Sequence, residues 1–220
     1  MSLTPPFTIV LADDHALLRD AVAKLLTDTQ DFEVLGHGGS ADQAVDLIVR
    51  HKPDIAMFDI DMPGLSSFDA ARSLQQLSPD TRTVFLSGFW HDQYIQAALG
   101  VQAMAYITKS EPPQRMIEAL RSVAMGRTYY SPEVRERIVV GVKGVDLKSK
   151  GTTRLDQLTK RELETLRYLA RGLSKKNTAV TMHLSVKTID KHATSLMRKL
   201  DIHDRVELAR YAIREGLVEA

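Results

Sequence analysis

Aspartates stand directly after two short apolar segments of this chain. Asp13 and Asp14 follow the segment TIVLA, and Asp59 and Asp61 lie within IAMFDIDMPG. Three kinds of chemistry are open to such aspartates. One carboxylate can accept a phosphoryl group, an Asp-x-Asp pair can act as nucleophile and proton carrier in a hydrolase, or the aspartates can be solvated turn residues. The elements that carry these residues decide which of the three applies.

The first half of the chain alternates between strand-like and helix-like segments. Short apolar segments are typical of buried strands, and the stretches between them repeat apolar residues at helical spacing. Five strand–helix pairs predict a parallel sheet with helices on both faces. Strands are expected at residues 8–12, 32–35, 55–58, 83–86 and 105–107, and helices at 16–27, 42–51, 68–77, 93–99 and 115–125.

Polar side chains follow four of these strands. Asp13 and Asp14 come after the first strand and Asp59 after the third, while Ser87 follows the fourth and Lys109 the fifth. Such strand ends lie at one edge of a doubly wound sheet, so the side chains should share a pocket. Clustered carboxylates repel one another and suit Mg²⁺, and a hydroxyl and an ammonium group can hold phosphoryl oxygens. Each residue alone is more often a cap, a turn residue or a solvated side chain, but together they favour phosphoryl chemistry.

Four motifs in this half resemble the receiver domain of two-component response regulators. They are IVLADDH, PDIAMFDIDMPG, VFLSG and AYITK, in the order and at the spacing of that family. The resemblance covers residues 7–127 and implies a flavodoxin-like α/β domain with a five-stranded parallel sheet of order 2-1-3-4-5. It also implies a histidine kinase as the partner that supplies the phosphoryl group.

The resemblance further implies a role for each polar residue at this edge of the sheet. Asp59 would be the phosphoryl acceptor. Asp14 and Asp59 would coordinate Mg²⁺, Asp13 would act through water, and the backbone carbonyl of Asp61 would be a further ligand. The remaining residues would be a switch pair, Ser87 and Tyr106, and the phosphate-pairing lysine, Lys109.

A hydrolase of the haloacid-dehalogenase type is the weaker interpretation of the same aspartates. In that pattern the Asp-x-Asp strand comes early in the chain and the acidic pair comes late, whereas here Asp13 and Asp14 come first. Met62 and Pro63 also stand where that family has a small hydroxyl-bearing residue. We therefore expect a regulator and not an enzyme.

Composition divides the chain into halves of opposite charge. Residues 1–130 hold 10 Lys and Arg against 16 Asp and Glu, a net −6, and residues 131–220 hold 19 against 12, a net +7. This asymmetry predicts two domains with different partners, the basic one being a candidate for nucleic acid. The absence of cysteine excludes disulfides and thiolate metal sites. No apolar stretch reaches membrane-spanning length and no secretory signal is present, so we expect a cytoplasmic protein without a membrane partner.

The basic half is expected to begin with a linker and to end in four short helices. Gly141, Gly144 and Gly151 stand among polar residues without a sustained period, which is typical of a linker. Gly172 suits the left-handed position that ends a helix. The helices should begin after the capping residues Thr159, Ser174, Ser185 and Asp204, with Glu162 and Glu207 in capping-box positions.

The third of these helices has two distinct faces. Its apolar stripe consists of Ile189, Ala193, Leu196 and Leu200. Another face carries Lys187, Lys191, Thr194 and Arg198 at the same spacing. A lone basic face is ordinarily a solvated surface, but this one follows a short helix and a turn. The arrangement predicts a helix-turn-helix whose second helix enters the major groove of DNA.

Two stretches, LTKRELETLRYLARGLS and LSVKTIDKHATSLMRKLDIHDRVELARYAIREGL, resemble the LuxR/NarL-type DNA-binding domain over residues 156–217. The match runs through all four helices, which outweighs the interpretation as a solvated surface. It implies that His192 and Lys199 contact the DNA backbone or are structural. The residues that we expect to contact double-stranded promoter DNA are Lys187, Thr188, Lys191, His192, Thr194 and Arg198.

The whole chain thus resembles NarL-family response regulators, with a receiver domain at 7–127, a linker at 128–155 and a DNA-binding domain at 156–217. Phosphorylation of Asp59 would let two chains pair on DNA as a homodimer through the last helix. The alternative is a receiver that acts through protein–protein contacts with weak or no DNA binding. The second helix of the tail departs from the family at Lys175, Asn177 and Thr178, which weakens its cap and packing and adds charge.

Overall fold

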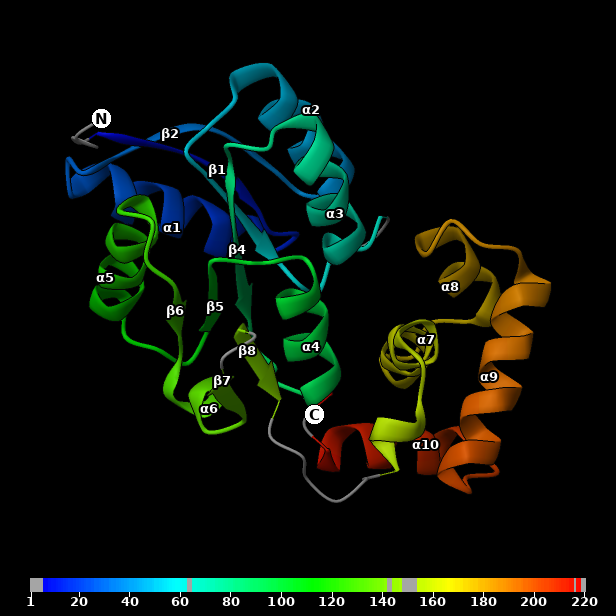
Figure 1. Ribbon diagram of the computed structural model, residues 1–220. Helices are drawn as coiled ribbons and strands as arrows, with labels where there is room; N and C mark the ends of the chain where they lie inside the picture. The colour runs from blue at the N-terminus through cyan, green and yellow to red at the C-terminus, as the bar shows by residue number, and fades with distance from the viewer. Residues whose placement is uncertain (1–5, 63–64, 142–143, 148–153, 216, 219–220) are drawn as a thin grey trace. The chain divides into compact units, whose positions relative to one another are not determined.

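The computed structural model describes residues 6–62, 65–141, 144–147, 154–215 and 217–218. The chain divides into two compact units, Met1–Lys148 and Ser149–Ala220. Figure 1 shows that the first is a sheet with helices around it and that the second is helical. Within the described residues, no helix has the length and apolar character needed to cross a bilayer.

The first unit is built on a six-stranded parallel sheet of order β2-β1-β3-β4-β5-β6. All five residues of β3 are buried, as expected of a central strand in a sheet covered on both faces. The predicted order 2-1-3-4-5 is confirmed, and β6 extends the sheet beyond β5. The strands are β1 (Phe7–Ala12), β2 (Phe32–Gly38), β3 (Ile55–Asp59), β4 (Arg82–Ser87), β5 (Ala105–Thr108) and β6 (Tyr129–Tyr130).

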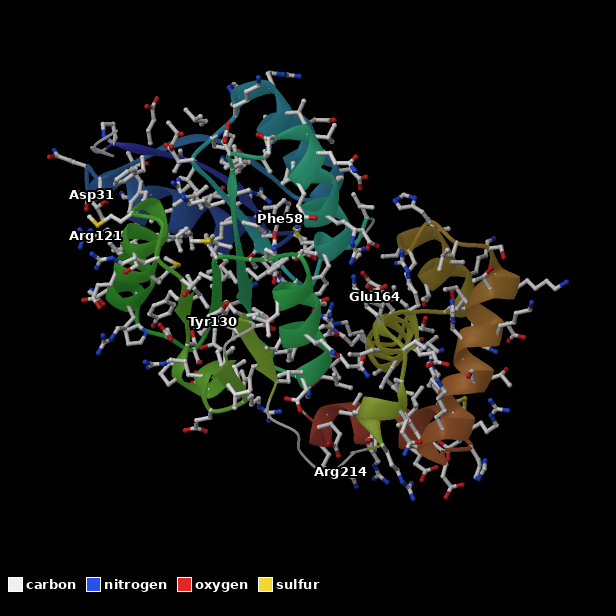
Figure 2. All side chains as sticks on the ribbon, viewed as in Figure 1. Asp31, Phe58, Arg121, Tyr130, Glu164 and Arg214 are labelled. Atoms are coloured by element: carbon white, nitrogen blue, oxygen red, sulfur yellow. The ribbon has the colours of Figure 1, made fainter. Side chains whose placement is uncertain are left out.

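Helices cover both faces of this sheet, with α1 and α5 on one face and α2, α3 and α4 on the other (Figure 1). On the first face, Leu26 of α1 and Leu120 of α5 pack with Leu11 of β1 in one apolar cluster. Arg121 donates from Nε to Asp31 Oδ2 at 2.8 Å, which joins α5 to the start of β2 (Figure 2). The helices are α1 (Ala16–Asp28), α2 (Ala41–His51), α3 (Ser67–Leu77), α4 (Asp92–Gly100) and α5 (Pro113–Ala124).

Aromatic rings fill the opposite face of the sheet. The ring centroids of Phe68 and Phe85 are 4.7 Å apart, and those of Phe68 and Tyr94 are 6.1 Å apart. Phe58 of β3 lies 6.4 Å from Phe85 of β4. Tyr94 is therefore a core residue that packs α4 against α3.

Residues 129–141 and 144–147 correct the prediction of a linker at 128–155, because they form elements of the first unit. Tyr129 and Tyr130 pair with Ala105 and Tyr106 of β5, and the sheet edge supplies the backbone partners that make this strand possible. β7 and β8 pair antiparallel, and β8 contacts α4. Arg137, directly before β7, has its Nη1 2.6 Å from Oδ1 of Asp92 in α4. The added elements are β6, α6 (Pro132–Arg135), β7 (Ile138–Gly141) and β8 (Gly144–Leu147).

The second unit contains the four predicted helices, preceded by a short 3-10 turn. Thr159 and Glu162 form the complete capping box of α7, and Gly172 has the left-handed φ of 91° that was expected after this helix. Ser174, Ser185 and Asp204 each accept a backbone N–H at the start of the following helix. The elements are η1 (Leu155–Gln157), α7 (Lys160–Ala170), α8 (Lys175–Thr181), α9 (Val186–Leu200) and α10 (Arg205–Arg214).

Candidate functional site

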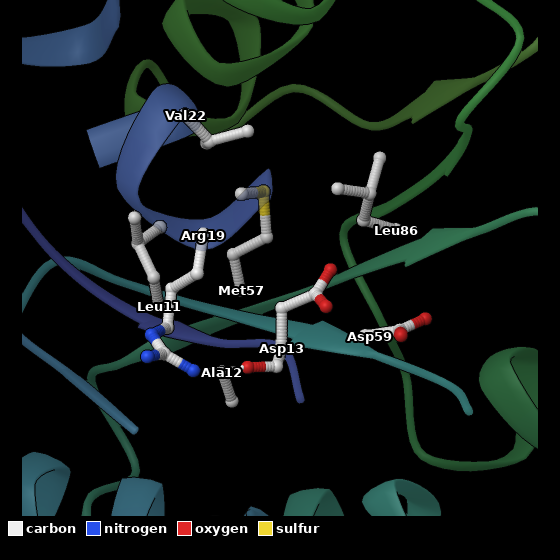
Figure 3. A pocket seen from close by; sticks show the side chains of 8 residues that line it. All are labelled: Leu11, Ala12, Asp13, Arg19, Val22, Met57, Asp59 and Leu86. Carbon is white, nitrogen blue, oxygen red and sulfur yellow. Dashed lines mark hydrogen bonds between the residues drawn. The ribbon is translucent and has the colours of Figure 1, made fainter. Parts of the chain in front are cut away.

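The predicted acidic pocket forms at the carboxyl ends of β1 and β3. Lys109 follows β5, and its Nζ lies 2.9 Å from both Asp13 Oδ2 and Asp59 Oδ2. Figure 3 shows Asp13 and Asp59 lining one pocket together with apolar side chains of the strands, among them Leu11, Met57 and Leu86. Arg19 of α1 donates from Nη1 to the backbone oxygen of Asp13 at 2.7 Å, which fixes the end of β1. The sheet therefore joins three residues that are up to 96 positions apart in the chain.

Burial controls the charge of Asp59. Its side chain is 1% exposed, and burial raises the pKa of Asp59 to about 6, with Lys109 lowering it and Asp13 raising it to smaller extents. Burial by itself lowers the pKa of Lys109, but the carboxylates of Asp59 and Asp13 outweigh this effect and leave it above its ordinary value. Lys109 is therefore protonated at neutral pH, and it faces the Asp59 carboxylate, whose ionised form is destabilised by burial.

Asp59 Oδ2 is open to a further partner. Among the described residues, no hydrogen bond of good geometry reaches this buried oxygen, although Lys109 forms an ion pair with it. The other oxygen, Oδ1, accepts the backbone N–H of Asp61 at 3.2 Å. A buried carboxylate oxygen that is incompletely satisfied is suited to a metal ion or to bond formation with an electrophile.

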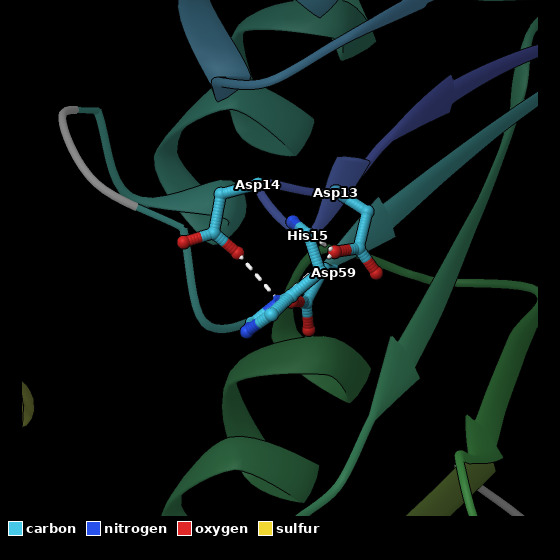
Figure 4. Close-up of side chains that lie close together, drawn as sticks. All are labelled: Asp13, Asp14, His15 and Asp59. Atoms are coloured by element: carbon cyan, nitrogen blue, oxygen red, sulfur yellow. Dashed lines mark hydrogen bonds and ion pairs between the residues drawn. The ribbon is translucent and has the colours of Figure 1, made fainter. Parts of the chain in front are cut away.

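His15 joins this cluster, which the residue patterns alone did not indicate. Side-chain ligand atoms of Asp13, Asp14, His15 and Asp59 all lie within 4.8 Å of one another (Figure 4). His15 Nδ1 is 2.9 Å from Asp14 Oδ1 and 3.2 Å from Asp13 Oδ1, while the His15 side chain remains 61% exposed. The signal in the sequence was its position directly after the aspartate pair. The Asp61 side chain is not part of this group; its predicted contribution was the backbone carbonyl.

Ser87 and Tyr106, the predicted switch pair, both contact the backbone of Phe89. Ser87 is fully buried, and its Oγ accepts the Phe89 N–H at 3.0 Å. Tyr106 is also fully buried, and its hydroxyl donates to the Phe89 carbonyl at 2.6 Å. Burial raises the pKa of Tyr106 far above its ordinary value, so the phenol remains neutral. The two side chains therefore hold one backbone segment between β4 and α4.

The strand β6 adds a second contact to this region that sequence patterns did not indicate. Ser131 is fully buried, and its Oγ accepts the Thr108 N–H at 2.9 Å. Its own N–H donates to the Tyr106 carbonyl at 3.0 Å. Ser131 thus fixes the end of β5, directly before Lys109. A single serine in a polar stretch carries no pattern that predicts such a contact.

The helix α9 has the two faces that were predicted for it. Ile189, Ala193, Leu196 and Leu200 are buried. Of the six predicted DNA contacts, Thr188 and His192 are half-buried at one flank, and the exposed ones are Lys187, Lys191, Thr194 and Arg198. The exposed four make up a continuous basic and polar face of α9.

Lys199 has a structural partner. Its Nζ lies 2.6 Å from Glu162 Oε2 of α7. Burial would raise the pKa of Glu162, but hydrogen bonds from Lys199, Ser195 and Thr159 outweigh burial and lower it to about 2. The structural alternative for Lys199 is therefore favoured over a DNA contact, because the ion pair fixes α9 against α7.

The departures in α8 have visible consequences. Thr178 is fully buried, and within the described part of the chain its Oγ1 has no hydrogen-bond partner. Asn177 still donates its backbone N–H to Ser174 Oγ at 3.1 Å. Lys175 forms an ion pair with Asp190 of α9. The short helix is thus held by its cap and by α9, with an unsatisfied hydroxyl in its packing face.

Two protein families match this chain. The response regulator receiver domain matches residues 9–121, and the luxR family of bacterial regulatory proteins matches residues 156–212. Oxygen regulatory protein NreC of Staphylococcus epidermidis is 33% identical over 215 residues, which is 96% of this chain and 99% of that protein. Transcriptional regulatory protein DegU of Brevibacillus brevis is 29% identical over 227 residues, 96% of this chain and 94% of its own.

A solved structure shares the fold. RcsB, a response regulator of Salmonella typhimurium described for its conformational dynamism in DNA interaction, aligns with a TM-score of 0.72 and 19% identity. The alignment covers 95% of this chain and 98% of RcsB. At this identity the likeness supports the architecture of both parts and says nothing about individual residues.

Proposed function

Because this chain belongs to the response regulators that join a receiver domain to a luxR-type DNA-binding domain, we propose that phosphorylation of Asp59 controls its binding to promoter DNA. The family consists of transcription regulators and is not a class of enzymes. We retain residues 7–127 and 156–217 as the two functional domains. The observation that carries the proposal is the buried Asp59 carboxylate, 2.9 Å from Lys109 and grouped with Asp13 and Asp14.

The receiver domain implies a histidine kinase as phosphoryl donor. An Asp59 oxygen forms the bond to phosphorus, the phosphorus–nitrogen bond of the donor phosphohistidine breaks, and the imidazole leaves and takes up a proton. Lys109 would then pair with the phosphoryl oxygens, since its ammonium already lies beside the acceptor. Lys109 pairs with Asp13, and Arg19 holds the backbone of Asp13. These contacts fix the surroundings of the acceptor carboxylate, which favours one direction of attack on the phosphorus.

Receiver domains bind Mg²⁺ at an acidic pocket, and the residues present fit that ion. The donors are carboxylate oxygens in excess over the one neighbouring ammonium, and Asp59 Oδ2 is incompletely satisfied. Asp14 and Asp59 would hold the ion, with Asp13 acting through water and Asp61 through its backbone carbonyl. Mg²⁺ would neutralise charge on the acceptor and on the incoming phosphoryl oxygens.

The switch pair supplies a route from the phosphoryl group to the surface. A phosphoryl oxygen would accept the Ser87 hydroxyl, and the hold of Ser87 and Tyr106 on Phe89 would change with it. Because Phe89 directly precedes the segment leading into α4, the position of that helix would be biased. Two chains would then pair through α10 on half-sites separated by about one helical turn of DNA or a multiple of it. We place this action in the cytoplasm, where promoter DNA is found.

The acceptor is tested by weighing the intact protein after incubation with Mg²⁺ and acetyl phosphate. We expect one added phosphoryl group on the wild type and none on Asp59→Asn. Asp61→Asn is the matched control and should keep the adduct, because only its backbone is expected to act. An adduct on Asp59→Asn would contradict the acceptor assignment, and free phosphate released in excess over protein would favour a hydrolase.

The output is tested by measuring DNA affinity before and after phosphorylation. Fluorescence anisotropy with promoter fragments at a fixed salt concentration should show tighter, sequence-dependent binding of the phosphorylated chain. Phosphorylation without any change in DNA affinity would instead indicate a receiver that acts through protein–protein contacts.

A further inference from the structure

The DNA-facing helix α9 carries one acidic side chain, Asp190, among its fifteen residues. It is one helical turn from both Lys187 and Thr194, at the edge of the basic and polar face. Its side chain is 57% exposed. A carboxylate at this position would be repelled by DNA phosphates, so its presence on a groove-facing helix requires a reason.

Lys175 of α8 compensates this charge. Its Nζ contacts Asp190 Oδ1 across the two helices, and its own side chain is 49% exposed. An ion pair so open to solvent contributes little to folding stability, so stability alone does not account for it. Within the described residues, Lys187 and Lys191 have no ion-pair partner, so Lys175 neutralises Asp190 without withdrawing these two cations from DNA.

The pair also leaves one oxygen of Asp190 available. Lys175 occupies Oδ1, and no contact of Oδ2 is found among the residues that the structure describes. In the major groove a carboxylate accepts a hydrogen bond from the N4 amino group of cytosine, and an Asn amide instead pairs with adenine. A neutralised carboxylate that presents a free acceptor at the edge of a groove-facing helix is suited to read cytosine.

We infer that Asp190 is a specificity-determining residue that reads a cytosine in the major groove, and that Lys175 is a positioning residue that neutralises and orients it. The inference rests on the proposed role of α9 in DNA reading and adds the base that one of its residues selects. It also explains the departure at Lys175, since a lysine there has a partner on the recognition helix.

The test begins with the full-length chain, phosphorylated with acetyl phosphate and Mg²⁺. A library of double-stranded oligonucleotides with a randomised core defines the preferred site, and anisotropy then measures affinity for all four base pairs at each position. We expect one position at which the wild type prefers cytosine by roughly five- to tenfold or more. Asp190→Ala should abolish that preference, and Asp190→Asn should move it towards adenine, with the other positions unchanged.

Lys175→Gln tests the positioning role. This change should weaken binding several-fold in the wild-type background and have a smaller effect in the Asp190→Asn background, where no charge needs compensation. Asp201→Asn, at the far end of α9, is the matched control for removing one negative charge and should leave every base preference intact. Circular dichroism should show the same helical content for all variants.

Three results would overturn the inference. If Asp190→Ala retains the ranking of base pairs at every position, Asp190 reads no base. If Lys175→Gln has equal effects in both backgrounds, the coupling to Asp190 is absent. If the wild type shows no sequence preference at all, the proposed DNA-reading function fails together with the inference, which separates that outcome from the other two.

Discussion

At the scale of single residues, the first unit holds a carboxylate where water cannot solvate it. Asp59 ends β3, a strand whose five residues are all buried, so the proposed acceptor lies within the core of the sheet. Its charge is maintained by Lys109 and opposed by burial and by Asp13. Holding the Asp59 carboxylate ionised in a buried position therefore lowers the stability of the fold, as is common for residues at functional sites.

Replacing Asp59 by Asn should stabilise the first unit at pH 7.5 in metal-free buffer. The pKa of Asp59 rises from 3.8 to about 6 on folding, so the folded state disfavours the ionised form. The destabilisation is absent below about pH 4, grows as the pH rises towards 6 and is complete above it, reaching roughly 1–3 kcal/mol. Urea unfolding followed by fluorescence of Trp90, the single tryptophan, should show this difference at pH 7.5 and its loss near pH 4.

Asp14→Asn is the control, because the Asp14 side chain is 30% exposed and its ionised form is better solvated. Its effect at pH 7.5 should be smaller than that of Asp59→Asn. A lower urea midpoint for Asp59→Asn than for the wild type at pH 7.5 would show that the ion pair with Lys109 outweighs burial.

At the scale of elements, strand β6 lies in the segment that was predicted to be a linker, and it supports the end of β5 beside the acidic pocket. It pairs with β5 and delivers Ser131 to the backbone on either side of Ile107, at Tyr106 and Thr108. The segments that hold Tyr106 and Lys109 are thereby fixed from the sheet edge as well as from β4. An element outside the matched receiver region thus contributes to the geometry of the acidic pocket.

Ser131→Ala should destabilise the first unit by about 1–3 kcal/mol, because the buried Thr108 N–H loses its acceptor. The measurement is again urea unfolding reported by Trp90. Ser122→Ala is the control, since the Ser122 hydroxyl donates to the Glu118 carbonyl of its own helix at an exposed position and should change stability little. Equal midpoints for Ser131→Ala and the wild type would mean that β6 is peripheral to the unit.

In the second unit, the ion pair of Glu162 and Lys199 joins the capping box of α7 to the recognition helix. Glu162→Gln keeps a side chain that can accept the Thr159 N–H but removes the charge, so the change isolates the ion pair. Lys199 is left facing a neutral amide at 26% exposure. The contact with α7 therefore helps to hold the basic and polar face of α9, the proposed DNA-reading face, in place.

Glu162→Gln should destabilise the second unit at neutral pH and become harmless in acid. The pKa of Glu162 falls from 4.5 to about 2 on folding, so its stabilisation is complete above pH 4.5 and is lost as the pH falls towards 2. At neutral pH the difference should be roughly 1–3 kcal/mol. Hydrogen exchange in α7 and α9, compared between wild type and variant across this range, measures it. A difference that persists unchanged at pH 2 would contradict the ion pair as its cause.

At the scale of the whole molecule, the two halves of the chain carry opposite net charges, −6 over residues 1–130 and +7 over residues 131–220. The acidic half contains the proposed phosphoryl site, and the basic half contains the exposed face of Lys187 and Lys191. Neutralisation of DNA phosphates by such cations makes affinity fall with salt in proportion to the number of contacts. The proposed phosphorylation site and the proposed DNA-binding face thus lie in halves of the chain with opposite net charge.

Lys187→Ala combined with Lys191→Ala should weaken DNA binding and lower the salt dependence. Each lost phosphate contact should reduce the slope of log affinity against log salt by about 0.9, so the double variant should lose up to about 2 in slope. Anisotropy titrations at several salt concentrations measure this. Lys24→Ala, on α1, is the control and should leave the slope unchanged. An unaltered slope in the double variant would remove these lysines from the DNA interface.

The sequence by itself determined the local structure and the site's main members. Alternating apolar segments predicted five of the six strands of the sheet, β1 to β5, and the helices α1 to α5. Thr159, Ser174, Ser185 and Asp204 predicted the four helix starts. These features depend on neighbours within a few residues, through backbone capping and helical or strand periodicity. The polar residues after successive strands could be grouped because parallel strands end at a common edge.

Only the tertiary structure decided which distant side chains meet. His15 joins the acidic cluster, Ser131 reaches Thr108, and Lys175 pairs with Asp190. None of these contacts follows from a periodic pattern, because each depends on the orientation of side chains brought together by packing or by a turn. The prediction of a linker at 128–155 was wrong over residues 129–141 and 144–147 for the same reason: the edge of the sheet and helix α4 can order a segment whose own composition does not demand it.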